Sequence, residues 1–78
     1  MQLLARTNDP VTLSYIVALL NEADIAHVVL DQNMSLLEGS IGIIPRRVMV
    51  GDETIGQARL LLRGADLERW LVPEGEAG

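Results

Sequence analysis

The sequence predicts a small α+β domain in which both helices cover one face of a three- or four-stranded sheet. Two amphipathic segments with helical spacing alternate with short apolar segments, in the order strand, helix, strand, strand, helix. The chain has only 78 residues, which suits a single domain. We expect this domain to span residues 1–72 and residues 73–78 to form a flexible acidic tail.

The first strand and the first helix are predicted by local signals. Gln2–Arg6 is short and largely apolar, as expected of a strand. Asp9 is suited to the N-cap of a helix and Pro10 to its first turn. Asp24 suits the left-handed position that follows a helix, after which Ile25 would pack back on the helix end. From Val11 the apolar residues Ile16, Leu19, Leu20 and Ala23 follow helical spacing, and Leu13 and Tyr15 widen this stripe.

Two more strands are expected at residues 26–30 and 46–50, with Pro45 leading into the second. The segment 26–30 is almost wholly apolar, which favours a strand covered on both faces. Side chains alternate between the faces of a strand, so one set should face the helices and the other should face away. We expect Val28, Leu30, Val48 and Val50 to face the helices, and His27, Val29, Arg47 and Met49 to face away.

A second helix is expected at Glu53–Arg63, with Asp52 as its cap. Residues 67–72 could form either a fourth strand or a further turn of helix. The resulting order β-α-β-β-α(-β) indicates a ferredoxin-like arrangement, and right-handed crossover places both helices on the same sheet face. The expected strand order is second, third, first, with residues 67–72 able to pair beside the first strand.

Composition excludes several classes of function. The formal charge is −5, and all six basic residues are arginines, so the chain is a poor match for nucleic acid. The sequence has no cysteine for a disulfide or a thiolate metal site. It also lacks an apolar run long enough to span a membrane. We therefore expect a cytoplasmic protein with no membrane contact and no cofactor.

The long segment between the second and third strands carries the candidate site residues. Asp31 and Glu38 could form a carboxylate pair, although Asp31-Gln32-Asn33 is also ordinary turn chemistry, which we favour. Gly39 and Gly42 could present backbone amides to an anion. The arginine pair that follows could bind a carboxylate or phosphate, but alternation should send its two side chains to opposite faces. The full candidate set is Asp31, Asn33, Glu38, Gly39, Ser40, Gly42, Arg46 and Arg47.

Several motifs together carry a family resemblance over roughly residues 3–62. They are Arg6-Thr7-Asn8-Asp9-Pro10, Asp31-Gln32-Asn33-Met34-Ser35, Glu38-Gly39-Ser40, Pro45-Arg46-Arg47, Asp52, Gln57-Ala58 and Leu61-Leu62. In these motifs the chain resembles a small bacterial family labelled putative prokaryotic signal-transducing proteins. The resemblance implies a compact fold distantly related to the nitrogen-regulatory PII proteins, with a projecting partner-binding loop at residues 31–44. The lysines of the PII phosphate-binding pattern are absent.

Two classes of function follow from these observations. The first, which we prefer, is a non-enzymatic regulatory module whose 31–47 segment contacts a protein partner or a small anionic ligand. The second is a small enzyme in which Asp31, Glu38, His27 and Arg47 converge at an oligomer interface, and a purely structural subunit is a third possibility. We also expect a homo-oligomer, either a dimer or a trimer, because a chain this short buries little surface alone.

Overall fold

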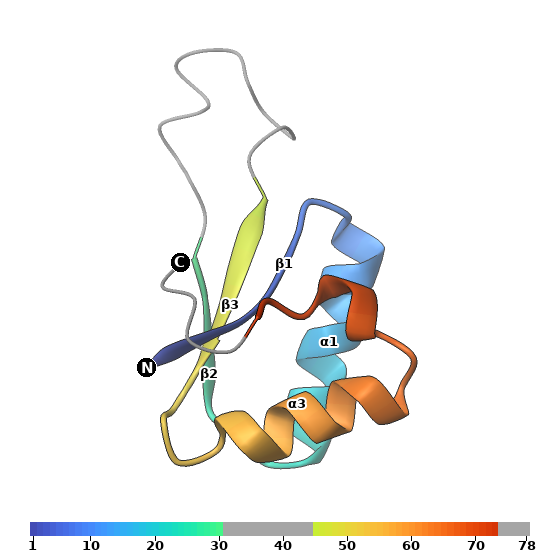
Figure 1. The fold of residues 1–78 in the computed structure, drawn as a ribbon. Coiled ribbons are helices and arrows are strands. Elements are labelled where there is room, and N and C mark those ends of the chain that lie inside the picture. The colour runs from blue at the N-terminus through green and yellow to red at the C-terminus, as the bar shows by residue number, and fades with distance from the viewer. Residues whose placement is uncertain (31–44, 74–78) are drawn as a thin grey trace.

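The elements follow one another in the predicted order of strand, helix, strand, strand, helix (Figure 1). A computed structural model describes residues 1–30 and 45–73 of the chain. Its elements are β1 (Gln2–Thr7), α1 (Pro10–Glu22), β2 (His27–Leu30), β3 (Arg46–Val50), α3 (Ile55–Gly64) and the short 3-10 helix η1 (Glu68–Trp70). The fold class is therefore confirmed as a small α+β arrangement consistent with a ferredoxin-like fold.

The sheet has the strand order β1-β3-β2, as predicted, and both pairings with β3 are antiparallel. The register between β1 and β3 shifts between Leu3 and Ala5, so Leu4 is the extra residue of a β-bulge. Both Leu4 and Ala5 are fully buried. The bulge thus places two neighbouring side chains of β1 in the core.

Helix α1 begins and ends where the sequence indicated. The carboxylate of Asp9 accepts hydrogen bonds from the backbone N–H groups of Val11 and Thr12, both at 3.3 Å. Asp24 has a φ of 62°, and the next residue, Ile25, donates its N–H to the carbonyl of Leu20 at 2.9 Å. This is the Schellman pattern, in which a left-handed residue turns the chain back over the helix end.

Helix α3 ends in the same way but begins later than predicted. It starts at Ile55 with Thr54 as the N-cap, and the prediction of Asp52 as cap is wrong. The N–H of Thr54 donates to the carbonyl of Gly51 at 3.0 Å, so a turn precedes the helix. At the other end Asp66 has a φ of 68° and the N–H of Leu67 donates to the carbonyl of Leu62 at 2.9 Å.

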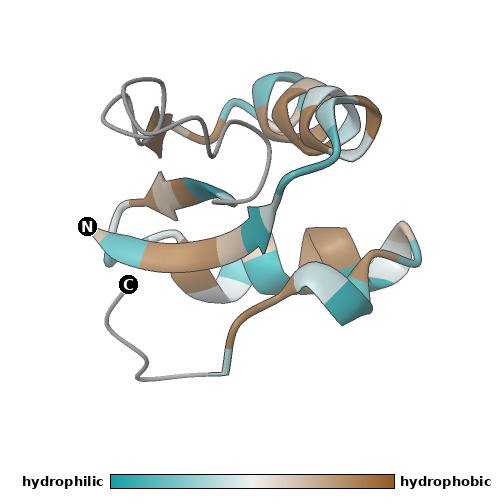
Figure 2. Cartoon of the chain, turned by 90° about the horizontal axis from the view of Figure 1, so that it is seen from above, coloured by the Kyte–Doolittle hydropathy of each residue, from teal (hydrophilic) through white to brown (hydrophobic). Residues whose placement is uncertain are grey.

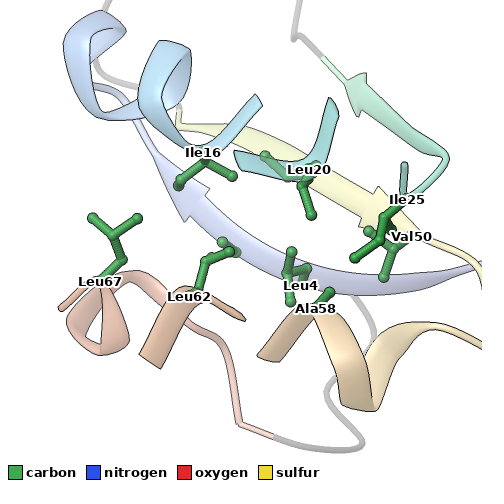
Figure 3. Packing of buried hydrophobic residues seen from close by; sticks show 10 residues of the cluster. Leu4, Ile16, Leu20, Ile25, Val50, Ala58, Leu62 and Leu67 are labelled. Atoms are coloured by element: carbon green, nitrogen blue, oxygen red, sulfur yellow. The ribbon is translucent and has the colours of Figure 1, made fainter. Parts of the chain in front are cut away.

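One hydrophobic core lies between the sheet and the two helices (Figure 3). In this view the side chains of α1 and α3 point toward one another and toward β1. Complete burial of a leucine, isoleucine or valine side chain stabilises the fold by about 1.5–3 kcal/mol. The residues in the middle of β1 are hydrophobic, as the brown colour in Figure 2 shows. The fully buried members with the largest side chains are Leu4, Ile16, Leu20, Val48, Val50 and Leu62.

Strand β2 faces the opposite way from our expectation. Directly opposed residues of antiparallel strands share a face, and β2 pairs His27 with Val50 and Val29 with Val48. Both valines of β3 are fully buried, so His27 and Val29 lie on the helix-covered face. The alternate side chains of β2 are exposed, with fractions of 43% for Val28 and 36% for Leu30. The predictions for these four β2 residues, and for a strand covered on both faces, are wrong.

The segment after α3 combines the two predicted alternatives. Residues 68–70 form the 3-10 helix η1, and Leu71 then makes an isolated antiparallel bridge to Ala5 on β1. The N–H of Val72 donates to the carbonyl of Leu4 at 3.1 Å. The guanidinium of Arg59 donates to the carbonyl of Val72 at 2.6 Å. This segment is held beside β1, as the predicted fourth strand would have been, although it forms only one bridge.

Replacing Leu62 by alanine tests the core. Leu62 is fully buried, so Leu62→Ala should lower the free energy of unfolding by about 2–5 kcal/mol. Leu60 lies on the same helix with 68% of its surface exposed, so Leu60→Ala should change stability by less than about 0.5 kcal/mol. Urea denaturation followed by circular dichroism measures both. Equal losses in the two variants would contradict the assigned helix face.

Candidate functional site

The structure describes two of the eight candidate site residues, Arg46 and Arg47. The other six lie outside the described residues, and they are Asp31, Asn33, Glu38, Gly39, Ser40 and Gly42. The site is therefore built from the part of the sheet that adjoins this segment, where β2 ends and β3 begins.

Arg46 and Arg47 point to opposite faces of β3, as alternation predicts. Arg46 pairs with Thr7. It lies two and four residues before the buried Val48 and Val50, so its side chain lies on the same face as theirs, at the end of the helix-covered face. Arg47 lies on the other face of the sheet, over which neither α1 nor α3 packs; we call this the open face. Both arginines are half-buried.

A third arginine joins this end of the sheet. The register pairs Arg6 of β1 directly with Arg47 of β3, so both side chains project from the open face. Opposed like charges destabilise a sheet unless something offsets their repulsion. Arg6 was absent from the predicted site, because its alignment with Arg47 depends on the bulge in β1. The signal that could have found it is the pairing of two strands that each carry an arginine near one end.

Apolar side chains surround the arginine pair on the open face. Leu30 of β2 pairs with Arg47 from the other side, so Arg6, Arg47 and Leu30 form one row across the three strands. The neighbouring row contains Leu3, Met49 and Val28, of which Leu3 is buried. Val28 and Leu30 are among the large hydrophobic residues that the structure leaves exposed. The open face therefore combines two guanidinium groups with an apolar strip.

The turn between β1 and α1 fixes the end of the strand that carries Arg6. The N–H of Asp9 donates to Oγ1 of Thr7 at 3.0 Å, and the hydroxyl of Thr12 donates to the carboxylate of Asp9 at 2.6 Å. The hydrogen bond from Thr12 is the main reason that the pKa of Asp9 lies below its ordinary value, and the backbone N–H groups of Val11 and Thr12 add to it. Asp9 is thus an anionic cap.

Of the four residues in the predicted enzyme site, the structure describes His27 and Arg47, while Asp31 and Glu38 lie outside the described residues. His27 lies on the helix-covered face and Arg47 on the open face, so the sheet separates them. Nδ1 of His27 lies 2.9 Å from the carbonyl oxygen of Ile25, and because a carbonyl can only accept, Nδ1 carries a proton. A hollow of about 340 Å³ borders His27, with Asn21 and Asp24 on its wall. No arginine lines it.

Residues 1–30 and 45–73 contain no group of three histidine, cysteine or acidic side chains placed to hold a metal ion. No helix in these ranges is long and apolar enough to cross a membrane. What the site can do chemically is to hold carboxylate or phosphate oxygens, for which the planar guanidinium is the best matched side chain.

The fold and this surface define a small two-layer α+β domain with a cationic end on its open sheet face. The chain belongs to the family described as putative prokaryotic signal transducing proteins, whose model matches residues 1–66. This confirms the family resemblance of the sequence. No curated protein matches the chain. The family description names signal transduction and no reaction, partner or ligand.

The stability of the Asp9 cap should depend on pH. A carboxyl group whose pKa is lowered by folding stabilises the fold above its unfolded pKa, and this stabilisation is lost as the pH falls through the folded pKa. We expect Asp9→Asn to melt a few degrees below the parent protein at neutral pH. The difference should shrink as the pH falls below the ordinary value of 3.8. Melting curves of both proteins from neutral to strongly acidic pH measure it; a constant difference would contradict the anionic cap.

Proposed function

We propose that this chain is a non-enzymatic regulatory module whose open sheet face binds carboxylate groups of a partner protein. The observation that carries the proposal is the direct pairing of Arg6 with Arg47. Both residues are half-buried, so their charge lies at a fixed place in the sheet. The role in signal transduction comes from the family description, and the mode of contact is our inference.

The distribution of charge supports this proposal. The chain carries eleven acidic and only six basic residues, yet three of the six arginines lie at one end of the sheet. Concentrating positive charge there opposes the net charge of −5, and a site for anions is one reason for such an arrangement. A guanidinium keeps its charge at any physiological pH, so these three arginines stay protonated.

A protein partner fits the surface better than a small anion. The arginine pair adjoins the exposed side chains of Val28 and Leu30, and interfaces between proteins commonly join arginine to apolar contacts. Small ligands are usually enclosed by a concave pocket. The hollow beside His27 belongs to the end of α1, and neither Arg6 nor Arg47 lines it.

Poly-L-glutamate serves as a probe of carboxylate binding. Nitrogen-15 NMR spectra should show the Nε–H signals of Arg6 and Arg47 shifting as poly-L-glutamate is added, and added sodium chloride should reduce the effect. A hydrogen bond to a charged group contributes about 1.5–3 kcal/mol, so Arg47→Gln should weaken binding roughly tenfold or more. Arg6→Gln should have a similar effect.

Arg63→Gln is the matched control, because it removes the same charge from a different surface. Nε of Arg63 lies 3.7 Å from a carboxylate oxygen of Glu68, and both side chains are largely exposed. This variant should bind poly-L-glutamate as the parent protein does. If all three variants bound poly-L-glutamate equally weakly, the effect would come from net charge alone, and the proposed binding site at Arg6 and Arg47 would be wrong. Saturable binding of inorganic phosphate at Arg6 and Arg47, without binding of poly-L-glutamate, would show that the ligand is a small anion and would overturn the proposal of a protein partner.

A further inference from the structure

We infer that the outer edge of β2 pairs with the β2 edge of a second copy of this chain, which joins two sheets into one. Strand β2 lies at the edge of the sheet (Figure 1). Within residues 1–30 and 45–73 it pairs with β3 alone. In an edge strand, the N–H and C=O groups of alternate residues point away from the sheet and can accept another strand.

The two edge strands of the sheet differ in whether another described segment of the chain covers their outer edge. The outer edge of β1 is covered by the chain itself, through the bridge between Leu71 and Ala5 and the hydrogen bond from Val72 to Leu4. Proteins usually protect an uncovered edge with a proline, a charged side chain or a bulge. β2 contains none of these, because its sequence is His-Val-Val-Leu and its register with β3 is regular. The bulge of this sheet lies in β1.

A second copy fits this edge because β2 is complementary to itself. A two-fold axis perpendicular to the sheet makes two β2 strands antiparallel and keeps each side chain on its own face. With Val29 on the axis, Val28 of each copy lies opposite Leu30 of the other. These are the two exposed side chains of β2, so the pairing covers apolar surface on both sides of the axis.

Charge also favours a second copy at this edge over one elsewhere. Each chain carries a net charge of −5, so two copies repel one another at long range. The four residues of β2 include no carboxylate and no arginine, so contact at this edge places no fixed like charges in opposition. Association there should strengthen as salt screens the repulsion. Carboxylate binding at Arg6 and Arg47 should respond to salt in the opposite direction, so the two proposals can fail independently.

Sedimentation of the full chain over a wide concentration range tests the inference. We expect a reversible equilibrium between a species of 8.5 kDa and one of twice that mass, shifted toward the larger species by sodium chloride. Val28→Lys introduces a charge at the edge and should weaken association at least tenfold. Val11→Lys is the matched control, because Val11 is 75% exposed on α1 and lies away from this edge. It should associate as the parent protein does.

Two further measurements make the outcome decisive. Circular dichroism melting must show that Val28→Lys is folded, and if it is not, Leu30→Lys takes its place. Hydrogen exchange should show protection of the outward amides of residues 27–30 that increases with protein concentration. A monomer at every concentration, equal association of the parent and Val28→Lys, or protection independent of concentration would overturn the inference. The last result would mean that the edge is covered by the same chain.

Discussion

The fold depends on how its two helices end. Two residues before its last residue, each helix has a fully buried leucine, Leu20 in α1 and Leu62 in α3, whose carbonyl accepts an N–H from the fifth residue after it at 2.9 Å. Between donor and acceptor lies an aspartate with positive φ, Asp24 or Asp66. The two stretches are alike in sequence, as Leu-Leu-Asn-Glu-Ala-Asp-Ile at 19–25 and Leu-Leu-Arg-Gly-Ala-Asp-Leu at 61–67. A residue that is not glycine adopts this backbone at some cost, which the closing hydrogen bonds and the buried apolar residue offset.

These helix ends set the direction of the chain that follows. The first turns it into β2 and buries Ile25, and the second turns it into η1 and buries Leu67. The hydrophobic cluster that includes Ile25 and Leu67 lies on the helix-covered face of the sheet. Along β3 the alternation then leaves Arg47 and Met49 for the open face. The long stem of an arginine can cover apolar surface, so Arg47, whose Nε is buried, suits a row that also contains Leu30.

Local signals in the sequence predicted much of this fold, and long-range pairing decided the rest. The cap at Asp9 and the left-handed Asp24 were predictable because each acts on its own few residues. The phase of β2 was not, because three of its four residues are apolar and either alternation looks acceptable. Its pairing with β3 decides the phase. Six candidate residues between β2 and β3 lie outside the described residues, and their part in the site stays a prediction.

Arg6 shows why the candidate site could not be completed from sequence. Gln2 pairs with Val50 and Leu3 with Met49, so a regular ladder would place Ala5, not Arg6, opposite Arg47. The bulge at Leu4 delays the register by one residue and aligns the two arginines. It does so while burying both Leu4 and Ala5, so the packing of the core and the pairing of the charges have the same cause. No local signal in residues 2–7 announces this bulge, since neither glycine nor proline occurs there.

The range matched by the family model includes the edge strand β2 but not the segment that covers the edge of β1. Residues 1–66 contain the arginine pair, the bulge and β2, whereas the residues that cover the edge of β1 lie beyond the matched range. Arg59 belongs to the matched range, yet it holds the carbonyl of Val72 at 2.6 Å. The segment that covers β1 is thus held in place partly by a residue of the matched range. Because that segment occupies the edge of β1, the edge of β2 is the one that the described chain leaves for another strand.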